Sequence, residues 1–184
     1  MNSFSKALCL PVFVLAGVGG AAAADPKVTH HAERIEHVRI VSPKPFDEVA
    51  GALERSLPEF DPAVTQAMAA GDEARAKKLE NGQKLFIFLK RNFGELLQVV
   101  GRPAKARQYE IGNPLTATRM TRHQLAAALY APLRVVVYEN ASGGSTFEYD
   151  RPSTLFGQFG DKRVTAVSRE LDQELADALE QAAR

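Results

Sequence analysis

Histidine is the residue with the most direct chemical use in this sequence, and three of its four copies lie close together: His30, His31 and His37. Imidazole nitrogens bind zinc and copper. His31 and His37 would share a face of any strand that covered both positions. Such metals need three or four ligands in a fixed geometry, so a polar tail followed by an exposed strand histidine is the favoured interpretation. Weak metal binding through the three histidines stays an alternative, and no cofactor is predicted.

A second group of polar residues lies on one predicted strand, residues 133–139. Its alternation places Arg134 and Tyr138 on one face and apolar residues on the other, which is the core face. An arginine and a tyrosine near the middle of a sheet need polar partners. Glu148, or Asp150 beside it, could provide them. The face is either the polar floor of a ligand groove, a dimer contact, or an ion-pair ladder exposed to solvent, and the sequence leaves these alternatives open.

The pair Asn113-Pro114 is typical of a helix start, because asparagine caps the first turn and proline fits its first position. It also has a functional interpretation, in which the amide lines a pocket beside backbone donors that could hold an anion. The plain cap is the favoured one.

The candidate binding residues are therefore Asn113, Arg134 and Tyr138, together with Tyr149 on the next predicted strand. No residue is predicted to be catalytic or to ligate a metal.

Signatures of common enzyme classes are absent from the sequence. It contains no Gly-x-Ser-x-Gly, no His-Glu-x-x-His and no glycine-rich phosphate loop. An enzyme of unassigned type stays an alternative to a binding module. It would use His123, Glu148 or Asp150 as acid–base groups near Arg134, provided that these groups converge in one concave site.

The first 24 residues have the three-part layout of a secretory signal peptide. One basic residue, Lys6, precedes an apolar run from 7 to 18, and the segment ends on Ala22-Ala23-Ala24 before Asp25. The run is shorter than the roughly 20 residues that span a membrane. We therefore predict cleavage after Ala24 and a periplasmic or secreted protein with no stable membrane anchor after cleavage.

The cysteine content and the net charge further limit the classes of function that are expected. The only cysteine, Cys9, lies in the predicted signal peptide, so the remaining chain has no thiol for catalysis, disulfide formation or metal binding. One of the 23 basic residues, Lys6, is in that segment and none of the 22 acidic ones is, so the remainder carries equal numbers of each. A nucleic-acid partner is not expected, because such proteins present a basic patch.

Residues 25–32 are polar and are predicted to be a flexible N-terminal segment, followed by a single domain over 33–184. Apolar periodicity predicts strands over 33–41, 85–89, 106–111, 133–139 and 145–150, and helices over 46–57, 96–100, 114–129 and from Gly160-Asp161 to the end. Residues 61–82 form one or two surface helices inserted between core elements. This order predicts an α+β domain with a mostly antiparallel sheet of about five strands and helices on one face.

Three stretches of the chain carry a resemblance to a known family. They are Tyr-Glu-Ile-Gly-Asn-Pro at 109–114, Leu-Tyr-Ala-Pro-Leu-Arg-Val-Val-Val-Tyr-Glu at 129–139 and Tyr-Asp-Arg-Pro-Ser at 149–153. With Met120 between them, they resemble the family called domain of unknown function 302, most strongly over 109–159. The inserted residues 61–82 depart from the general pattern. Asn92-Phe93-Gly94 stands where members of a closer subgroup often carry Asp-His-Gly.

The resemblance implies a curved antiparallel sheet that grips a long helix, similar to the TATA-binding-protein fold, but it implies no activity, since fold is not function. Combined with the neutral charge and the missing motifs, it leads us to expect a small-ligand-binding or protein-interaction module rather than an enzyme. The expected partners are a small apolar or amphipathic ligand and a second copy of the chain.

Overall fold

Five antiparallel strands form one sheet in the order β1-β5-β4-β3-β2. The computed structural model describes residues 25–184, and residues 33–184 form one compact unit. The strands are β1 His37–Ser42, β2 Phe86–Asn92, β3 Ala106–Gly112, β4 Leu133–Glu139 and β5 Ser145–Asp150. The first strand in the sequence thus pairs with the last one. Strands β1 and β2 form the two edges of the sheet.

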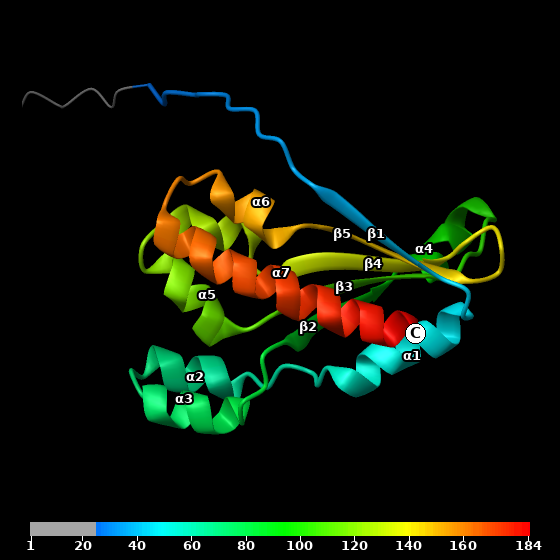
Figure 1. Cartoon of the computed structure of the whole chain (residues 1–184), viewed down its shortest axis with the longest axis horizontal. Coiled ribbons are helices and arrows are strands. Elements are labelled where there is room, and N and C mark those ends of the chain that lie inside the picture. The colour runs from blue at the N-terminus through cyan, green and yellow to red at the C-terminus, as the bar shows by residue number, and fades with distance from the viewer. Residues whose placement is uncertain (1–24) are drawn as a thin grey trace, which may run out of the picture. The chain divides into compact units, whose positions relative to one another are not determined.

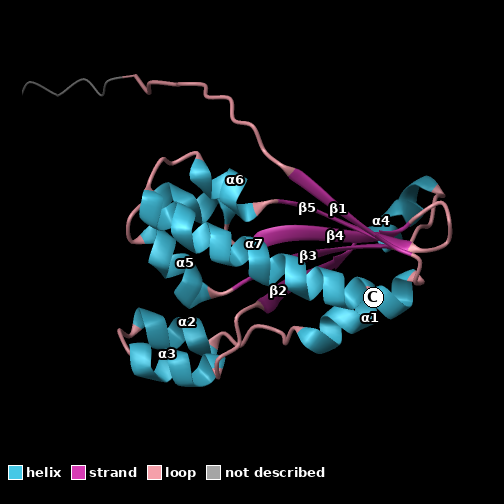
Figure 2. Ribbon diagram, viewed as in Figure 1, coloured by secondary structure: helices cyan, strands magenta, loops and turns pink. Residues whose placement is uncertain are grey.

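Helices pack on one face of this sheet (Figures 1 and 2), with α7 lying along the strands and α1, α5 and α6 beside it. The α-helices are α1 Phe46–Ser56, α2 Ala63–Ala69, α3 Glu73–Glu80, α4 Phe93–Leu96, α5 Pro114–Thr121, α6 Pro152–Gly157 and α7 Lys162–Ala183. Two 3₁₀ helices, η1 Leu97–Val100 and η2 Leu125–Tyr130, complete the described elements. Within residues 25–184, no helix is long and apolar enough to cross a membrane.

The core lies between the sheet and α7. One stripe of the helix, including Leu171, Leu175 and Leu179, is buried against inward-facing residues of β3, β4 and β5. On β4 the alternation is the predicted one, because the residues on the core face are buried: Leu133, Val135 and Val137. Arg134 on the opposite face is exposed and Tyr138 is half-buried, so this second face of the sheet is open to solvent.

The predicted α+β architecture is confirmed: the sheet has five antiparallel strands and its main helices lie on one face. Strands β4 and β5 have the predicted bounds. Helix α7 begins after Asp161, whose side chain accepts a hydrogen bond from the backbone N–H of Arg163. The inserted segment forms two helices, α2 and α3, which end at Asn81 in the left-handed conformation.

Several elements of the structure differ from the prediction. The helix predicted over 114–129 is wrong as a single element, because α5 ends at Thr121 and the chain resumes as η2. Gln124 between them is extended, which turns the chain so that Ala127 enters the core. Helix α6 was not predicted, because its six residues are too few to show a helical period.

The first strand begins at His37 rather than at residue 33, and the described residues before it form no helix or strand. His31 is therefore not on a strand, so the condition under which it would share a strand face with His37 is not met. The predicted signal peptide, residues 1–24, lies outside the described residues.

Candidate functional site

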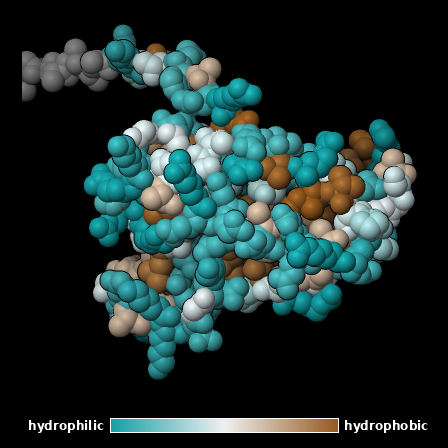
Figure 3. All heavy atoms as spheres, viewed as in Figure 1, coloured by the Kyte–Doolittle hydropathy of each residue, from teal (hydrophilic) through white to brown (hydrophobic). Residues whose placement is uncertain are grey.

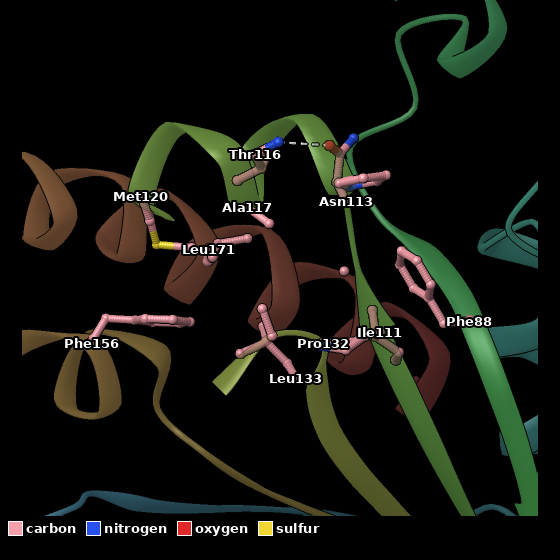
Figure 4. Close-up of a pocket in the computed structure, with 13 residues that line it drawn as sticks. Phe88, Ile111, Asn113, Thr116, Ala117, Met120, Pro132, Leu133, Phe156 and Leu171 are labelled. Carbon is pink, nitrogen blue, oxygen red and sulfur yellow. Dashed lines mark hydrogen bonds between the residues drawn. The ribbon is translucent and has the colours of Figure 1, made fainter. Parts of the chain in front are cut away.

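An apolar cavity of about 190 Å³ lies at the end of the sheet where β3 and β4 meet the helices (Figure 4). Residues from six elements form most of its wall: Phe88 of β2, Ile111 of β3, Ala117 and Met120 of α5, Leu133 of β4, Phe156 of α6 and Leu171 of α7. None of the residues that line it carries a charge. Apolar cavities of about 150 Å³ hold molecules the size of benzene, so this one has room for a small neutral molecule.

Asn113 caps α5, as the favoured interpretation of Asn113-Pro114 has it, and also lies at the rim of this cavity. Its Oδ1 accepts a hydrogen bond from the backbone N–H of Thr116 at 2.8 Å, and its Nδ2 donates to the backbone oxygen of Gln83 at 3.2 Å. The residue is almost fully buried. Because these polar atoms are engaged by the protein, they leave the cavity wall apolar.

Residues of the inserted segment that contains α2 and α3 pack against the rim of the cavity. The ring of Phe60, just before α2, stacks on Phe88 of the cavity wall with ring centroids 4.3 Å apart. Glu80 at the end of α3 is buried beside the side chain of Asn113 and the backbone N–H of Leu115. Burial raises the pKa of Glu80, and the neighbouring Asn113 and Leu115 donors only partly oppose this shift.

A hollow of about 440 Å³ separates the insert from α5, and Figure 3 shows hydrophobic residues at its edge. Most of the charged side chains that line this hollow form ion pairs with other residues of the protein. Arg119 makes two hydrogen bonds with Glu170, at 2.7 and 2.8 Å, and Lys77 pairs with Glu73 at 2.6 Å. The cavity is therefore the better candidate for a ligand site.

A second candidate region lies on the open face of the sheet, where Glu148 of β5 is the centre of a polar cluster. Its Oε1 accepts hydrogen bonds from the Tyr138 hydroxyl at 2.5 Å and from Arg39 Nε at 2.9 Å. Its Oε2 is 2.9 Å from His37 Nε2, and the other ring nitrogen of His37 is 2.9 Å from Asp150 Oδ1. Both nitrogens of this imidazole thus contact carboxylates.

These contacts change the acid–base behaviour of the cluster. Hydrogen bonds from Tyr138, His37 and Arg39 lower the pKa of Glu148 to about 2. The hydrogen bonds to Asp150 and Glu148 raise the pKa of His37. The Glu148 carboxylate thus acts as the common acceptor for donors of β1 and β4.

The four predicted binding residues fall in three separate places. Asn113 lies at the cavity, and Arg134 and Tyr138 lie on the open face. Tyr149 pairs with Val135 in the register of β4 and β5 and is buried on the core face, where burial raises its pKa. The structure therefore brings Arg134 and Tyr138 together on one face but not with the other two.

Of the acid–base groups named for the enzyme alternative, only some lie close together. A shallow groove of about 200 Å³ on the open face is lined by His37, Arg134, Glu148 and Asp150 among others. His123, which follows α5, is not among the residues that line it. The histidine of this cluster is His37, which no local pattern links to β5, since the two are more than 100 residues apart.

Within the described residues no group of three or more histidine, cysteine, aspartate or glutamate side chains is arranged to hold a metal ion. His30 and His31 lie in the segment 25–32, and both ring nitrogens of His37 are engaged by carboxylates. Sequence reasoning also missed the apolar residues of the cavity, such as Phe156 and Leu171, because they have the same pattern as ordinary core residues.

Comparison with known proteins agrees with the motifs of the sequence. No curated protein matches the chain. The fold is similar to a crystal structure of an uncharacterized conserved protein DUF302 from Bacillus stearothermophilus, with a TM-score of 0.59 and 20% identity over 80% of this chain and 98% of that one. The model of the family "Domain of unknown function DUF302" matches residues 72–182. That match spans more than half of the chain, and the protein therefore belongs to the DUF302 family.

Proposed function

We propose that the protein binds a small, neutral, apolar ligand in the cavity beneath α5. The observation that carries this proposal is the cavity wall, which is built mainly from hydrophobic residues and contains no charged side chain. Burial of an apolar molecule there is favourable by about 25 cal/mol per Å² of apolar surface removed from water. A charged ligand would lose its hydration without a partner.

The rim supports the proposal because it combines a rigid part with half-buried residues that can admit a ligand. Asn113 and Pro114 hold the start of α5 in place, while Thr116, Ala117 and Pro132 of the wall are half-buried. Most described ligand sites are such largely preformed concave apolar sites. We further propose that binding takes place in the periplasm or outside the cell, after removal of residues 1–24. Cell fractionation with N-terminal sequencing of the purified protein tests the location, and an intact Met1 terminus in the cytosolic fraction contradicts it.

Toluene and indole are suitable probes, because each is a small neutral molecule of the size that the cavity admits. Isothermal titration calorimetry should detect binding with a negative heat-capacity change, which marks burial of apolar surface. At a probe concentration 100 times Kd the protein should gain about 2.7 kcal/mol of stability.

Ala117→Leu is the test variant, since the added methyl groups fill the cavity from α5 (Figure 4). It should weaken probe binding at least tenfold. Ala166→Leu makes the same change at an exposed position of α7 and should bind the probes as the unmodified chain does. The proposal is wrong if neither probe binds, or if both variants bind as well as the unmodified chain.

A further inference from the structure

Side chains on the open face of the sheet form a regular charge pattern across four strands. The register aligns His37 of β1 with Asp150 of β5, and Arg134 of β4 with Glu110 of β3. Because Tyr149 pairs with Val135, Asp150 and Arg134 are also neighbours in the same row. With His37 held between two carboxylates, the row has alternating positive and negative charges from β1 to β3.

Part of this row is unpaired within the described chain. Arg134 is exposed and forms no ion pair there, although Glu110 lies opposite it on β3. Glu110 also has no ion-pair partner among these residues. The side chain of Asp150 contacts His37 but is still 44% exposed. These three groups can therefore accept further charged partners without breaking an existing contact.

We infer that the open face is the contact surface of a homodimer, in which two copies pack sheet against sheet about a two-fold axis parallel to the strands. The axis runs between β4 and β5. It reverses the strand order, so that Arg134 meets the partner subunit's Asp150 and His37 meets the partner subunit's Glu110. A row of alternating charges with an even number of members is complementary to its own reversed copy, as an isologous interface requires.

The distribution of charges along the strands also favours a two-fold axis parallel to the strands over one that runs across them. The row at the opposite end of the strands is less polar and includes Val41 of β1, Tyr138 of β4 and Ala106 of β3. Val41 is 66% exposed. An axis across the strands would place the charged row against this row and leave charges without partners, which costs free energy. The axis along the strands pairs each row with itself.

The area of the face indicates how strong the dimer is. About this axis four of the five strands overlap, because β2 lies beyond the edge of the partner subunit's sheet. Four strands about 4.8 Å apart and some six residues long, at about 3.3 Å per residue, offer roughly 400 Å² per subunit. The two copies together would bury roughly 800 Å², which is the size of a weak, transient interface. We therefore expect a dimer that dissociates at micromolar concentrations, and whose association weakens with added salt. This inference uses the face opposite to the cavity and does not depend on the proposed ligand.

Charge exchange tests the inference directly. Sedimentation velocity of the chain between 1 and 200 µM, that is ~10⁻⁶ to ~10⁻⁴ M around the dissociation constant expected for so small an interface, should show a monomer–dimer equilibrium. Arg134→Glu alone, and Asp150→Arg alone, should each weaken self-association at least tenfold, because each places like charges opposite one another. An equimolar mixture of the two variants should dimerise again, since each altered charge then meets its opposite.

Arg169→Glu is the matched control, because Arg169 of α7 is exposed on the helical side of the molecule and forms no ion pair within residues 25–184. It should dimerise as the unmodified chain does. If Asp150→Arg does not fold, as judged by circular dichroism, Val136→Glu tests the same face without removing a contact of the polar cluster. A chain that is monomeric throughout this range, or an Arg134→Glu variant that dimerises fully, overturns the inference.

Discussion

At the scale of single residues, the contacts of Glu148 show how the open face of the sheet holds its charges. Three donors from β1 and β4 converge on one carboxylate, and His37 links it to Asp150. Charge-assisted hydrogen bonds of this kind are stronger than neutral ones. The cluster therefore joins the edge strand β1 to β5, in addition to the backbone ladder between them.

The cluster predicts a pH dependence of stability. The pKa of Glu148 is lowered in the folded state from its ordinary value of 4.5 to about 2, so its stabilising contribution is present above pH 4.5 and is lost as the pH falls toward 2. The pKa of His37 is raised above 6.5, so its contribution is complete below pH 6.5 and is lost as the pH rises through the folded value. The contribution of the cluster is thus largest between pH 4.5 and 6.5.

Urea unfolding between about pH 3 and 9, which brackets the ordinary pKa values of both groups, measures this dependence. His37→Gln should remove the loss of unfolding free energy above pH 6.5 that the unmodified chain shows. His123→Gln, outside the cluster, should leave that loss in place. If His37→Gln and the unmodified chain lose stability in parallel above pH 6.5, His37 does not carry the effect.

At the scale of elements, Asn113 has two positions at once: it caps the start of α5 and forms part of the cavity rim. Asn113 accepts the hydrogen bond of the Thr116 N–H and lies in the cavity rim. Loss of an N-cap costs about 0.5–2 kcal/mol. A disturbed first turn would also move Ala117 and Thr116, which form part of the wall.

Asn113→Ala should therefore lower the unfolding free energy by about 1 kcal/mol and weaken binding of the toluene probe. Asn113→Ser is the matched control, because serine can also cap the helix while it lacks the amide that donates to Gln83. It should recover most of the lost stability. Equal losses in the two variants would show that the contact with Gln83, and not the cap, holds the start of α5.

At the scale of the whole molecule, α7 is the element on which most of the others depend. It contacts α1, α5, α6 and β1, and Leu175 and Leu179 on its inner face are completely buried. The sheet alone would expose its apolar face to water, so the sheet and α7 are expected to form and unfold together.

Leu175→Ala should lower the unfolding free energy by about 2–5 kcal/mol, as expected when a buried leucine is replaced and a cavity remains. Unfolding should stay a single transition by circular dichroism and by tyrosine fluorescence. Leu96→Ala, at a position that is 57% exposed, should change the stability by less than about 0.5 kcal/mol. Two separate transitions, or a loss under about 1 kcal/mol for Leu175→Ala, would contradict this view of α7.

Local patterns in the sequence were sufficient for much of the fold. Alternation over residues 133–139 identified β4 and its core face, and the apolar stripe of α7 identified the long helix. The caps Asn113 and Asp161 marked two helix starts. Each of these signals depends on neighbouring residues only, and its physical cause, side-chain direction or an orphan backbone N–H, acts within one or two turns. The break after α5 was not predictable in this way, because the core position of Ala127 competes with helix propensity.

The sequence by itself thus determined most of the element types, the core face of β4 and the membership of the DUF302 family through its motifs. Only the tertiary structure decided which elements are neighbours. The pairing of β1 with β5 brings His37 to Glu148, and six elements far apart in the chain meet to form the cavity. Periodicity shows which face of an element is apolar but not what packs against it, because that depends on the packing of the whole core.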